Sequence, residues 1–466
     1  MAASPPLSPS LLAAKTLRIA SWIGQHPPSP PADAHLQLVR PPKRKRARSA
    51  PMAGRRQPSP EKRQRVDEGV MPEESASVTF SGHPLDLGQH NTFSRAGTGA
   101  SSPRRSISPS RETVATLKKA LPPILAEPFD GAQLPAHGAI RDKVMAAMER
   151  LEPGQVDGWV PRCLRSAILS DTALGVQTFD RHAFLDSPAS LSECDPPLRK
   201  ELQYTLEKVK QIYQRARTCK TRGRDENAWC QVVIQPLVEL ALELSSNGKL
   251  LLQSVQTQAI ELGYLSTDSR TGRRLDRKAD FTLSYSHEAS DLAALYARLP
   301  PRNSAVSHVS DAFTKTTALF SGIEAKPADG DKSEAECQIS IWMGASLRKK
   351  AELARMAGLS DMTSALIEPA FVVVGHEWYF YLVYLQPTGA VHVLEHGSCS
   401  TNSVSGVFKI LRVLRNVVEY GLEGFEGGPE ARVGYWGGFL GPVLERLAGG
   451  EATGNASAAT PRDDVT

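Results

Sequence analysis

The sequence has few cysteines and no pair of them at metal-binding spacing. Six occur among 466 residues, and no two are separated by only two residues, as they are in the half-sites of zinc domains. This scatter argues against a zinc site and against a disulfide framework, and it favours a reducing compartment. The six are Cys163, Cys194, Cys219, Cys230, Cys337 and Cys399.

Long apolar runs are absent as well. No run reaches the roughly 20 residues that a transmembrane helix needs, and no continuous apolar core of the secretory type stands near the N-terminus. We therefore expect no membrane partner. Residues 11–23, LLAAKTLRIASWI, form a short basic amphipathic stretch with no acid before Asp33, so a mitochondrial presequence is one alternative for them.

Charge is unevenly distributed along the chain. Residues 1–112 carry 17 Lys and Arg against 8 Asp and Glu, whereas the rest of the chain carries 38 against 42. The first region is rich in Pro, Ser, Ala and Arg, so it cannot bury enough apolar surface to offset the entropy lost on ordering. We predict a disordered basic arm over 1–112 and a disordered tail over 449–466. On the slightly acidic part between them, a nucleic-acid-binding face would have to be a local patch.

Basic clusters lie within the predicted arm, between residues 43 and 65. They read KRKRAR from Lys43 and KRQR from Lys62. Clusters of this kind are typical of nuclear localisation signals and of nucleic-acid-binding arms. We expect a nuclear protein that a nuclear import receptor binds through residues 43–65. A solvated linker is the alternative role, and the mitochondrion or the cytoplasm is the alternative location.

After the arm, apolar residues follow first helical and then strand spacing. Helices are predicted over 112–125, 139–153, 196–218 and 225–244, the last with a kink at Pro236. Strands are predicted over 249–262, 279–286, 316–326 and 390–397, with a hairpin over 370–386 that turns near Gly375. Further helices are predicted over 290–299, 333–358 and 403–425. This order predicts a mixed α/β domain with a helical N-terminal part, 113–200, and a main part, 201–448.

The predicted strand 316–326 ends in Glu324-Ala325-Lys326. Residues i and i+2 of a strand project to one face, so the acid and the base would stand side by side. Asp280 begins the preceding predicted strand and would bring a second carboxylate. Hard divalent cations prefer such oxygen ligands, and in phosphodiester hydrolysis they neutralise charge and activate water. The pattern is therefore typical of a metal-dependent nuclease that uses Mg²⁺ or Mn²⁺.

A surface ion pair of little energetic value is the plain alternative for Glu324 and Lys326. Glu-x-Lys arises by chance about once in a chain of this length, and Asp276 and Lys278 form a second acid-x-Lys pattern in a charged run that no strand precedes. The order of the segments favours Glu324. A helix with an acid, a strand with Asp, a strand with Glu-x-Lys and a helix with Gln follow one another.

This order resembles the PD-(D/E)XK nuclease superfamily, and in particular the fungal proteins that carry a PD-(D/E)XK nuclease-like domain. The resemblance covers residues 200–440. Its segments are ENAWCQVVIQPLVELAL, KADFTLSYS, GIEAKPADGDKSEAECQISIWMGASLRKKAEL, FVVVGHEWYFYLV and SVSGVFKILRVLRNVVEY. It implies a restriction-endonuclease-like fold, a mixed sheet flanked by helices. It also implies a Mg²⁺-dependent hydrolase acting on nucleic acid, in the first place DNA.

The resemblance also implies roles for five residues. Asp280 and Glu324 would be metal ligands, Lys326 the catalytic lysine, and Glu226, on the helix before the sheet, the acid that completes the metal site. Gln338 matches the first position of a Gln-x-x-x-Tyr element, with Trp in place of Tyr four residues on. It would contact the metal-bound water or the DNA backbone.

The sequence departs from the family pattern at three points. Alanine rather than proline precedes Asp280, 44 residues separate Asp280 from Glu324, and Glu239 competes with Glu226 on the same predicted helix. A catalytically inactive nuclease fold that binds nucleic acid or protein in the nucleus is therefore the alternative function. A purely structural nuclear protein that binds through its basic arm is a third. No oligomeric state is indicated.

Overall fold

The computed structural model describes residues 115–129, 134, 138–152, 158–185, 188–425 and 434–449. The predicted arm over 1–112, with the basic clusters at 43–65 and the stretch 11–23, lies outside the described residues, and so does the predicted tail beyond Gly449. In the described parts of the chain, no helix combines the length and apolarity needed to cross a membrane. All six cysteines are unpaired and buried.

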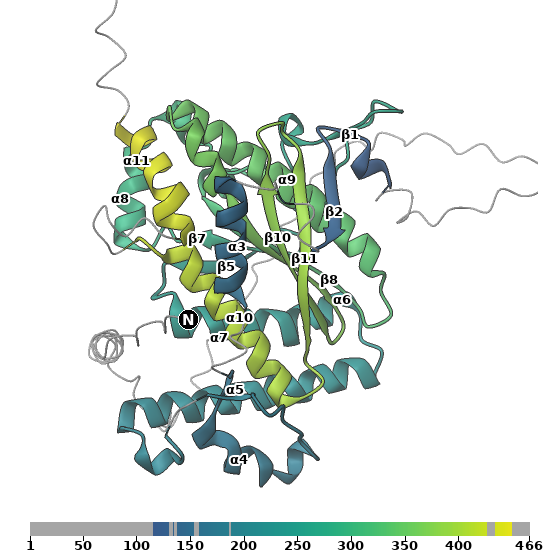
Figure 1. The fold of residues 1–466 in the computed structure, drawn as a ribbon, viewed down its shortest axis with the longest axis vertical. Helices are drawn as coiled ribbons and strands as arrows, with labels where there is room; N and C mark the ends of the chain where they lie inside the picture. The colour runs from purple at the N-terminus through teal and green to yellow at the C-terminus, as the bar shows by residue number, and fades with distance from the viewer. Residues whose placement is uncertain are drawn as a thin grey trace, which may run out of the picture. The chain divides into compact units, whose positions relative to one another are not determined.

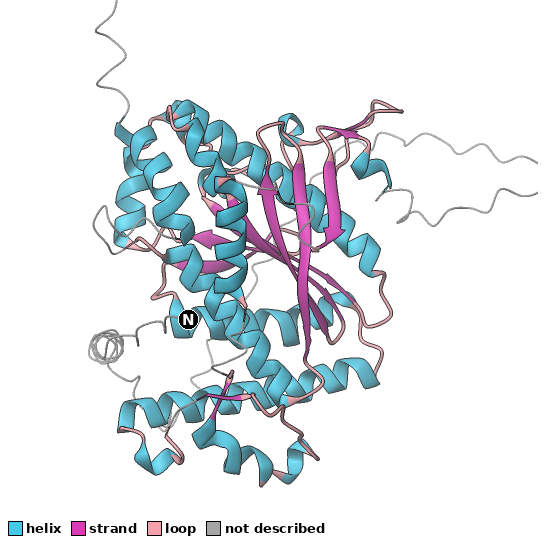
Figure 2. Cartoon of the chain, in the orientation of Figure 1, coloured by secondary structure: helices cyan, strands magenta, loops and turns pink. Residues whose placement is uncertain are grey.

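A seven-stranded mixed sheet forms the centre of the described part (Figure 2). Its strand order is β2-β11-β10-β9-β8-β7-β5. The pairs β8–β9 and β11–β2 are parallel, and the other neighbouring pairs are antiparallel. The strands are β2 (Ile124–Pro128), β5 (Leu250–Ser254), β7 (Phe281–Tyr285), β8 (Leu319–Lys326), β9 (Ile367–Val374), β10 (Glu377–Leu385) and β11 (Val391–Ser400).

Helices cover both faces of this sheet, which confirms the predicted mixed α/β class. Helix α9 packs against β8, β9 and β10 on one face, and α3 and α10 cover the other (Figure 1). Two small pairs stand outside the sheet, β1 (Ala120–Leu121) with β6 (Thr267–Asp268) and β3 (Val160–Pro161) with β4 (Phe184–Leu185). The α-helices are α3 (Ala139–Leu151), α4 (Arg165–Leu169), α5 (Pro196–Thr221), α6 (Glu226–Trp229), α7 (Gln235–Ser245), α8 (Ser290–Arg298), α9 (Lys332–Met356), α10 (Val404–Leu422) and α11 (Gly441–Gly449).

The helix predicted over 112–125 is wrong. Of its described part, only residues 115–118 are helical, and the chain then forms β1 and β2. Pro122 and Pro123 lack the backbone donors that a helix needs, and parallel pairing with β11 holds the following residues extended. The segment 113–200 therefore supplies an edge strand of the main sheet as well as helices.

Other predicted elements differ in detail. The strand predicted over 249–262 ends at Ser254. A π-helical segment, η4 (Cys230–Ile234), interrupts the helix predicted over 225–244 directly before Pro236, where a kink was expected because proline lacks the donor for the next helical bond. Within the long interval from Asp280 to Glu324, residues 286–318 loop out and contain α8, so that β7 and β8 still pair. The π-helical segment η9 (Trp436–Leu440) and α11 were not predicted.

Helix α9 lies in close contact with β8 because β8 has a glycine at the crossing. A β-carbon on Gly322 would lie 3.0–3.1 Å from side-chain atoms of Ile339, Trp342 and Met343. Trp342 is fully buried, with its ring edge-on to that of His308 at a centroid distance of 4.4 Å. The face of β8 that bears Gly322 is therefore the α9 face.

Strand β8 changes face at Ser321. Phe320 packs against α10, where a β-carbon on Gly421 would lie 2.6 Å from its ring, whereas Gly322 packs against α9. Residues two apart in a regular strand share a face. They do not here, because β8 has one residue more than β7 between two paired positions and Ser321 has a φ of 63°. This is a β-bulge, which re-aims the residues that follow it.

A buried charged cluster stands behind the bulge. The carboxylate of Glu368, in β9, accepts hydrogen bonds from the Lys350 ammonium and from the Tyr435 hydroxyl at 2.5 Å, and a long one from the Ser321 N–H at 3.4 Å. Lys350 also donates to the Ser346 hydroxyl at 2.8 Å. Lys350 and Glu368 are 3% and 0% exposed, so each charge depends on the other for its stabilisation.

Removing one partner of this pair should be costly. We expect Lys350→Met to lower the free energy of unfolding by about 3–5 kcal/mol, because the Glu368 carboxylate is left buried and uncompensated, and Lys350→Met/Glu368→Leu to recover part of that loss. The control is Lys118→Met, which breaks a solvent-exposed pair with Glu127 and should cost less than about 1 kcal/mol. Urea unfolding of the three variants checks this, and equal losses in the two single variants would contradict it.

Candidate active site

Asp280 lies directly before β7, and its carboxylate is close to that of Glu324 in β8. The Asp280 N–H donates to the Ile323 carbonyl at 3.1 Å, and the next residue, Phe281, is paired with Ile323. The Asp280 carboxylate also accepts from the N–H of Ala325, the residue after Glu324. Asp280 is close enough to Glu324 for its charge to raise the pKa of that carboxyl, so the two carboxylates share one local environment.

Lys326 lies between two carboxylates. Its Nζ donates to Glu324 Oε1 at 2.7 Å and to Glu226 Oε2 at 3.2 Å. Glu226 is the first residue of α6, and the Asp225 side chain fixes that helix start by accepting from the Ala228 N–H at 3.0 Å. The structure thus brings together Asp280, Glu324, Lys326 and Glu226 from three separate segments.

The two competing patterns lie elsewhere. Glu239 is exposed on α7 and accepts from Gln235 in its own helix at 2.8 Å, so the structure places Glu226, and not Glu239, beside the lysine. In the second acid-x-Lys pattern, Lys278 donates to the Thr257 carbonyl at 3.0 Å. That lysine is held by backbone and not by a pair of carboxylates.

Gln338 lies on α9, the helix that packs against β8. It precedes Trp342 by one helical turn, toward the end of β8 that carries Lys326, because α9 runs back along the strand from its start at Lys332. Its Oε1 atom is buried and has no hydrogen-bond partner among the described residues. No hydrogen bond joins it to the four clustered residues in that part of the chain. It is the one predicted site residue that the structure leaves outside their direct contacts.

The cluster holds more negative than positive charge. Glu324 is 2% exposed; burial, and then the neighbouring Asp280, raise its pKa to about 9 against the opposing effect of Lys326. Burial also raises the pKa of Asp280. For Lys326, burial lowers the pKa, but Glu324 and Glu226 more than offset this, so the pKa lies above its usual value. Three carboxylates around one ammonium form an environment that favours an added cation.

Asp280 is held by two donors that the sequence did not reveal as site residues. The Ala325 N–H donates to its Oδ2 and the Gln256 amide to its Oδ1, both at 2.7 Å. Gln256 lies two residues beyond β5, in a segment without any motif. Only the pairing of Ser254 with Phe281 carries it alongside Asp280, and that register was not visible in the sequence.

His376 has contacts that support the fold, and among the described residues none of them is with the carboxylate cluster. It lies in the β9–β10 turn, as predicted, and its Nδ1 is 2.9 Å from the Thr401 hydroxyl. Burial, with a smaller effect of Lys220, lowers its pKa to about 4. The β9–β10 turn contacts the end of β8, because the Gly375 N–H donates to the Lys326 carbonyl at 3.0 Å. At Gly375, where φ is 55°, a β-carbon would lie 2.6 Å from the Ala328 Cα, so glycine is required there.

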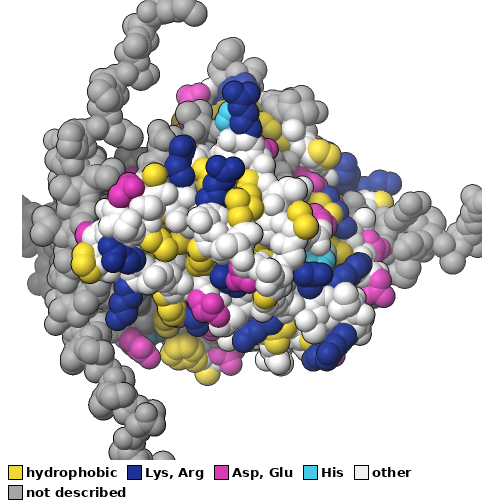
Figure 3. Space-filling model, turned by 90° about the horizontal axis from the view of Figure 1, so that it is seen from below, with side chains coloured by type: hydrophobic (Ala, Val, Ile, Leu, Met, Phe, Trp, Pro, Cys, Tyr) yellow, Lys and Arg dark blue, Asp and Glu magenta, His cyan; other side chains and the backbone are white. Residues whose placement is uncertain are grey.

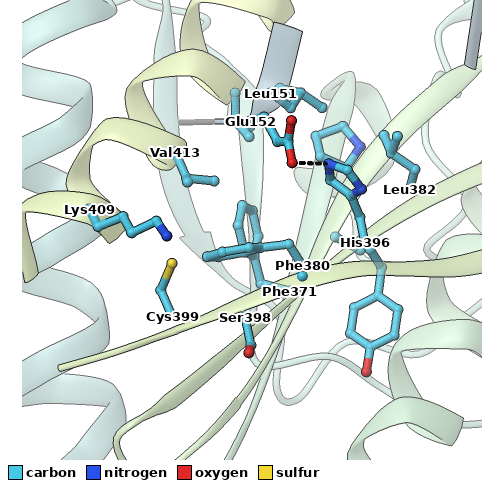
Figure 4. A pocket seen from close by; sticks show the side chains of 15 residues that line it. Leu151, Glu152, Phe371, Phe380, Leu382, His396, Ser398, Cys399, Lys409 and Val413 are labelled. Carbon is cyan, nitrogen blue, oxygen red and sulfur yellow. Dashed lines mark ion pairs between the residues drawn. The ribbon is translucent and has the colours of Figure 1, made fainter. Parts of the chain in front are cut away.

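A separate cavity lies on the opposite face of the sheet, between β9–β11 and the helices α3 and α10 (Figure 4). Phe371, which lines it, is paired with Ile323 and not with Glu324. Its polar pair is His396 and Glu152, whose atoms are 3.9 Å apart, and burial lowers the pKa of His396. The cavity is therefore no part of the carboxylate cluster.

The donor atoms of the cluster fit a hard divalent cation, although they are not assembled around one position. Within the described ranges, no three His, Cys, Asp or Glu side chains form a ready ligand group, because the Lys326 ammonium stands between Glu324 and Glu226. Carboxylate oxygens are nevertheless the ligands that Mg²⁺ and Mn²⁺ prefer. The excess negative charge described above and the unpartnered Gln338 Oε1 nearby also fit such an ion.

A mixed sheet with an acid at the start of one strand and Glu-x-Lys at the end of its antiparallel neighbour defines a nuclease-type α/β domain. Residues 174–426 match the family model of the PD-(D/E)XK nuclease superfamily. The chain belongs to this superfamily. No curated protein and no solved structure matches the chain.

The environment of His376 predicts acid sensitivity. Its pKa is about 4 in the fold and about 6.5 when unfolded, so the unfolded chain binds the extra proton between these values. Stability from the neutral histidine is present above pH 6.5 and is lost as the pH falls toward 4. We expect wild type to lose about 1–2 kcal/mol more than His376→Gln between pH 7 and pH 5. Urea unfolding at both pH values, with the exposed His182→Gln as control, checks this; equal losses would refute it.

Proposed function

We propose that the chain is a metal-dependent nuclease, a phosphodiester hydrolase of the kind carried by the fungal proteins with such a domain, acting on nucleic acid and in the first place on DNA. The observation that carries the proposal is the position of Lys326. Its ammonium is 2.7 Å from Glu324, and the Asp280 carboxylate, held by the Ala325 N–H, is close to Glu324. A nuclear location, reached through residues 43–65, belongs to the same proposal.

Asp280, Glu324 and Glu226 would hold Mg²⁺ or Mn²⁺. When bound, such an ion neutralises charge on the phosphate and makes water a stronger nucleophile at neutral pH. Asp280 is restrained for this role by its two donors, Gln256 and the Ala325 N–H. Glu226, with a side chain 38% exposed, is the most accessible of the three carboxylates.

The two carboxylates that Lys326 contacts favour its ammonium form. A lysine with a pKa above its usual value is protonated at neutral pH, so it is a poor base. It would instead donate hydrogen bonds to the negative charge that develops on the phosphate oxygens. Gln338, whose Oε1 atom lacks a partner among the described residues, would accept a hydrogen bond from the attacking water. Attack in line on phosphorus then forms one P–O bond and breaks the bond to the leaving oxygen, which takes up, through solvent, a proton equivalent to the one that the water loses.

The second candidate function is an inactive nuclease fold that binds nucleic acid or protein in the nucleus. One observation favours it. Lys326 occupies the space between Glu324 and Glu226, and the described residues contain no ready ligand group. The two candidates differ in whether the ammonium yields that space to a cation.

Cleavage by the full chain tests the proposal. Labelled duplex, single-stranded and branched DNA, and RNA, are incubated with Mg²⁺, Mn²⁺ or EDTA. We expect metal-dependent cutting that Lys326→Ala slows at least about 100-fold, because a donor to the developing charge is lost. The control is Lys332→Ala, which removes a lysine six residues on that pairs with Glu395 at 2.7 Å. The proposal fails if wild type cuts none of these substrates, or if Lys326→Ala cuts them as fast as the control.

Metal binding has a readout that is independent of cutting. An ion that binds only the folded state increases the free energy of unfolding, by about 2.7 kcal/mol when its concentration is 100 times its dissociation constant. The melting temperature rises accordingly. We expect Mn²⁺ to raise the melting temperature of wild type and to raise it much less in Glu324→Gln and Glu226→Gln. Glu239→Gln, which alters the exposed acid on α7, should respond as wild type does. A Mn²⁺ shift that survives in Glu324→Gln and disappears in Glu239→Gln would place the ion elsewhere.

A further inference from the structure

Two basic segments lead into the carboxylate cluster from different parts of the chain. The first basic segment, residues 215–224, is the end of α5 and the turn before α6; the second, residues 270–278, precedes β7. They contain ten Lys and Arg and one acid, although 38 basic and 42 acidic residues follow residue 112. The basic residues are Arg215, Arg217, Lys220, Arg222 and Arg224, and Arg270, Arg273, Arg274, Arg277 and Lys278. This is a local concentration of positive charge on an acidic domain.

Each segment ends two residues before an acid of the cluster. The first ends two residues before Glu226 and the second two residues before Asp280, and two residues span at most about 7 Å of extended chain. The Asp225 cap of α6 holds the first junction in place. The ladder bond from Asp280 to Ile323 holds the second. The positive charge is therefore tied to the site by rigid elements.

The segments border the site on different sides. Lys220, in the first, is close enough to His376 to lower its pKa, and His376 lies in the turn behind Lys326. Arg277, in the second, is close enough to Cys337 to oppose the rise in its thiol pKa, and Cys337 is the neighbour of Gln338 on α9. One basic segment thus lies near the β9–β10 turn and the other near the start of α9.

The charges of the first segment are not neutralised within the described part of the chain. Its five basic side chains are exposed there, and no ion pair joins any of them to a described carboxylate. Figure 1 shows α5 beneath the sheet and α6 beside the end of β8. On the face seen from below in Figure 3, basic side chains are spread among acidic and apolar ones, so it is the position of these segments beside the cluster that distinguishes them from other surface lysines and arginines.

A solvated surface is the plain explanation for exposed Lys and Arg, but it does not account for this position. Like charges concentrated at the rim of one site repel one another, and a polyanion relieves that repulsion while releasing its counterions. Arg and Lys side chains that contact phosphates position a nucleic acid without reading its sequence. The chemistry of the two segments therefore matches a phosphodiester backbone.

We propose that residues 215–224 and 270–278 bind the phosphate backbone of a nucleic acid on either side of the carboxylate cluster and so place a phosphate against Lys326. The role of this surface in placing a phosphate for cleavage rests on the proposed nuclease function. Binding itself needs only the two segments and requires no cutting. It is sequence-independent and sensitive to salt.

Charge reversal in the full chain tests this surface. The variants are Arg222→Glu/Arg224→Glu in the first segment and Arg273→Glu/Arg277→Glu in the second. The matched control, Arg181→Glu/Arg302→Glu, reverses two exposed arginines outside both segments. Affinity for a short fluorescent DNA duplex, for its single strand and for an RNA duplex is measured in EDTA over a range of salt, after equal melting temperatures have shown that each variant is folded. All variants keep the basic residues 43–65.

We expect each segment variant to bind the preferred probe at least about tenfold more weakly than the control and to lower the slope of log affinity against log salt by about 2, since each lost phosphate contact lowers it by about 0.9. Weakened binding without any cutting by wild type would refute the nuclease function and leave the binding surface standing. Cutting by wild type, with both segment variants binding and cutting as the control does, would refute the surface and leave the nuclease function standing.

Discussion

The arrangement of the whole site depends on one extra residue in β8. Because Ser321 forms a bulge, Phe320 points toward α10 and Gly322 toward α9. Every side chain beyond the bulge is therefore on the face opposite to the one a regular strand would give it. Without this extra residue, Glu324 and Lys326 would point toward the side of the sheet that carries α10. The buried carboxylate of Glu368, which accepts from the Ser321 N–H, is placed to stabilise the bulge.

The site concentrates carboxylates at the cost of electrostatic repulsion. Asp280, Glu324 and Glu226 surround one ammonium, and the raised pKa of Glu324 reflects both its burial and its acidic neighbour. A cluster of this kind adds little to stability, since the cost of desolvating its charges offsets much of their attraction. This arrangement agrees with the proposed function, in which a cation joins the carboxylates.

Much of the site was visible in the sequence, because strand periodicity and segment order are local signals. Alternation along β8 places Glu324 beside Lys326, and the order of elements leads from Glu226 to Asp280. The bulge at Ser321 had no such signal, since a serine with positive φ depends on surrounding contacts. Lys350, Glu368 and Gln256 were likewise missed, because each acquires its role from a strand or helix distant in sequence. The helix predicted over 112–125 failed for the same reason, through pairing of β2 with β11.

The pairing of β2 with β11 shows that the folded domain is longer than the segment that matches the superfamily. Residues 174–426 match the superfamily, yet β2 (Ile124–Pro128), fifty residues earlier, is the parallel neighbour of β11. Cutting the chain at the family boundary would leave the backbone groups of β11 unpaired along that edge and expose an open template for intermolecular strand addition. A fragment limited to the family match would then be prone to aggregate. A fragment that begins before residue 115 keeps β2 paired with β11.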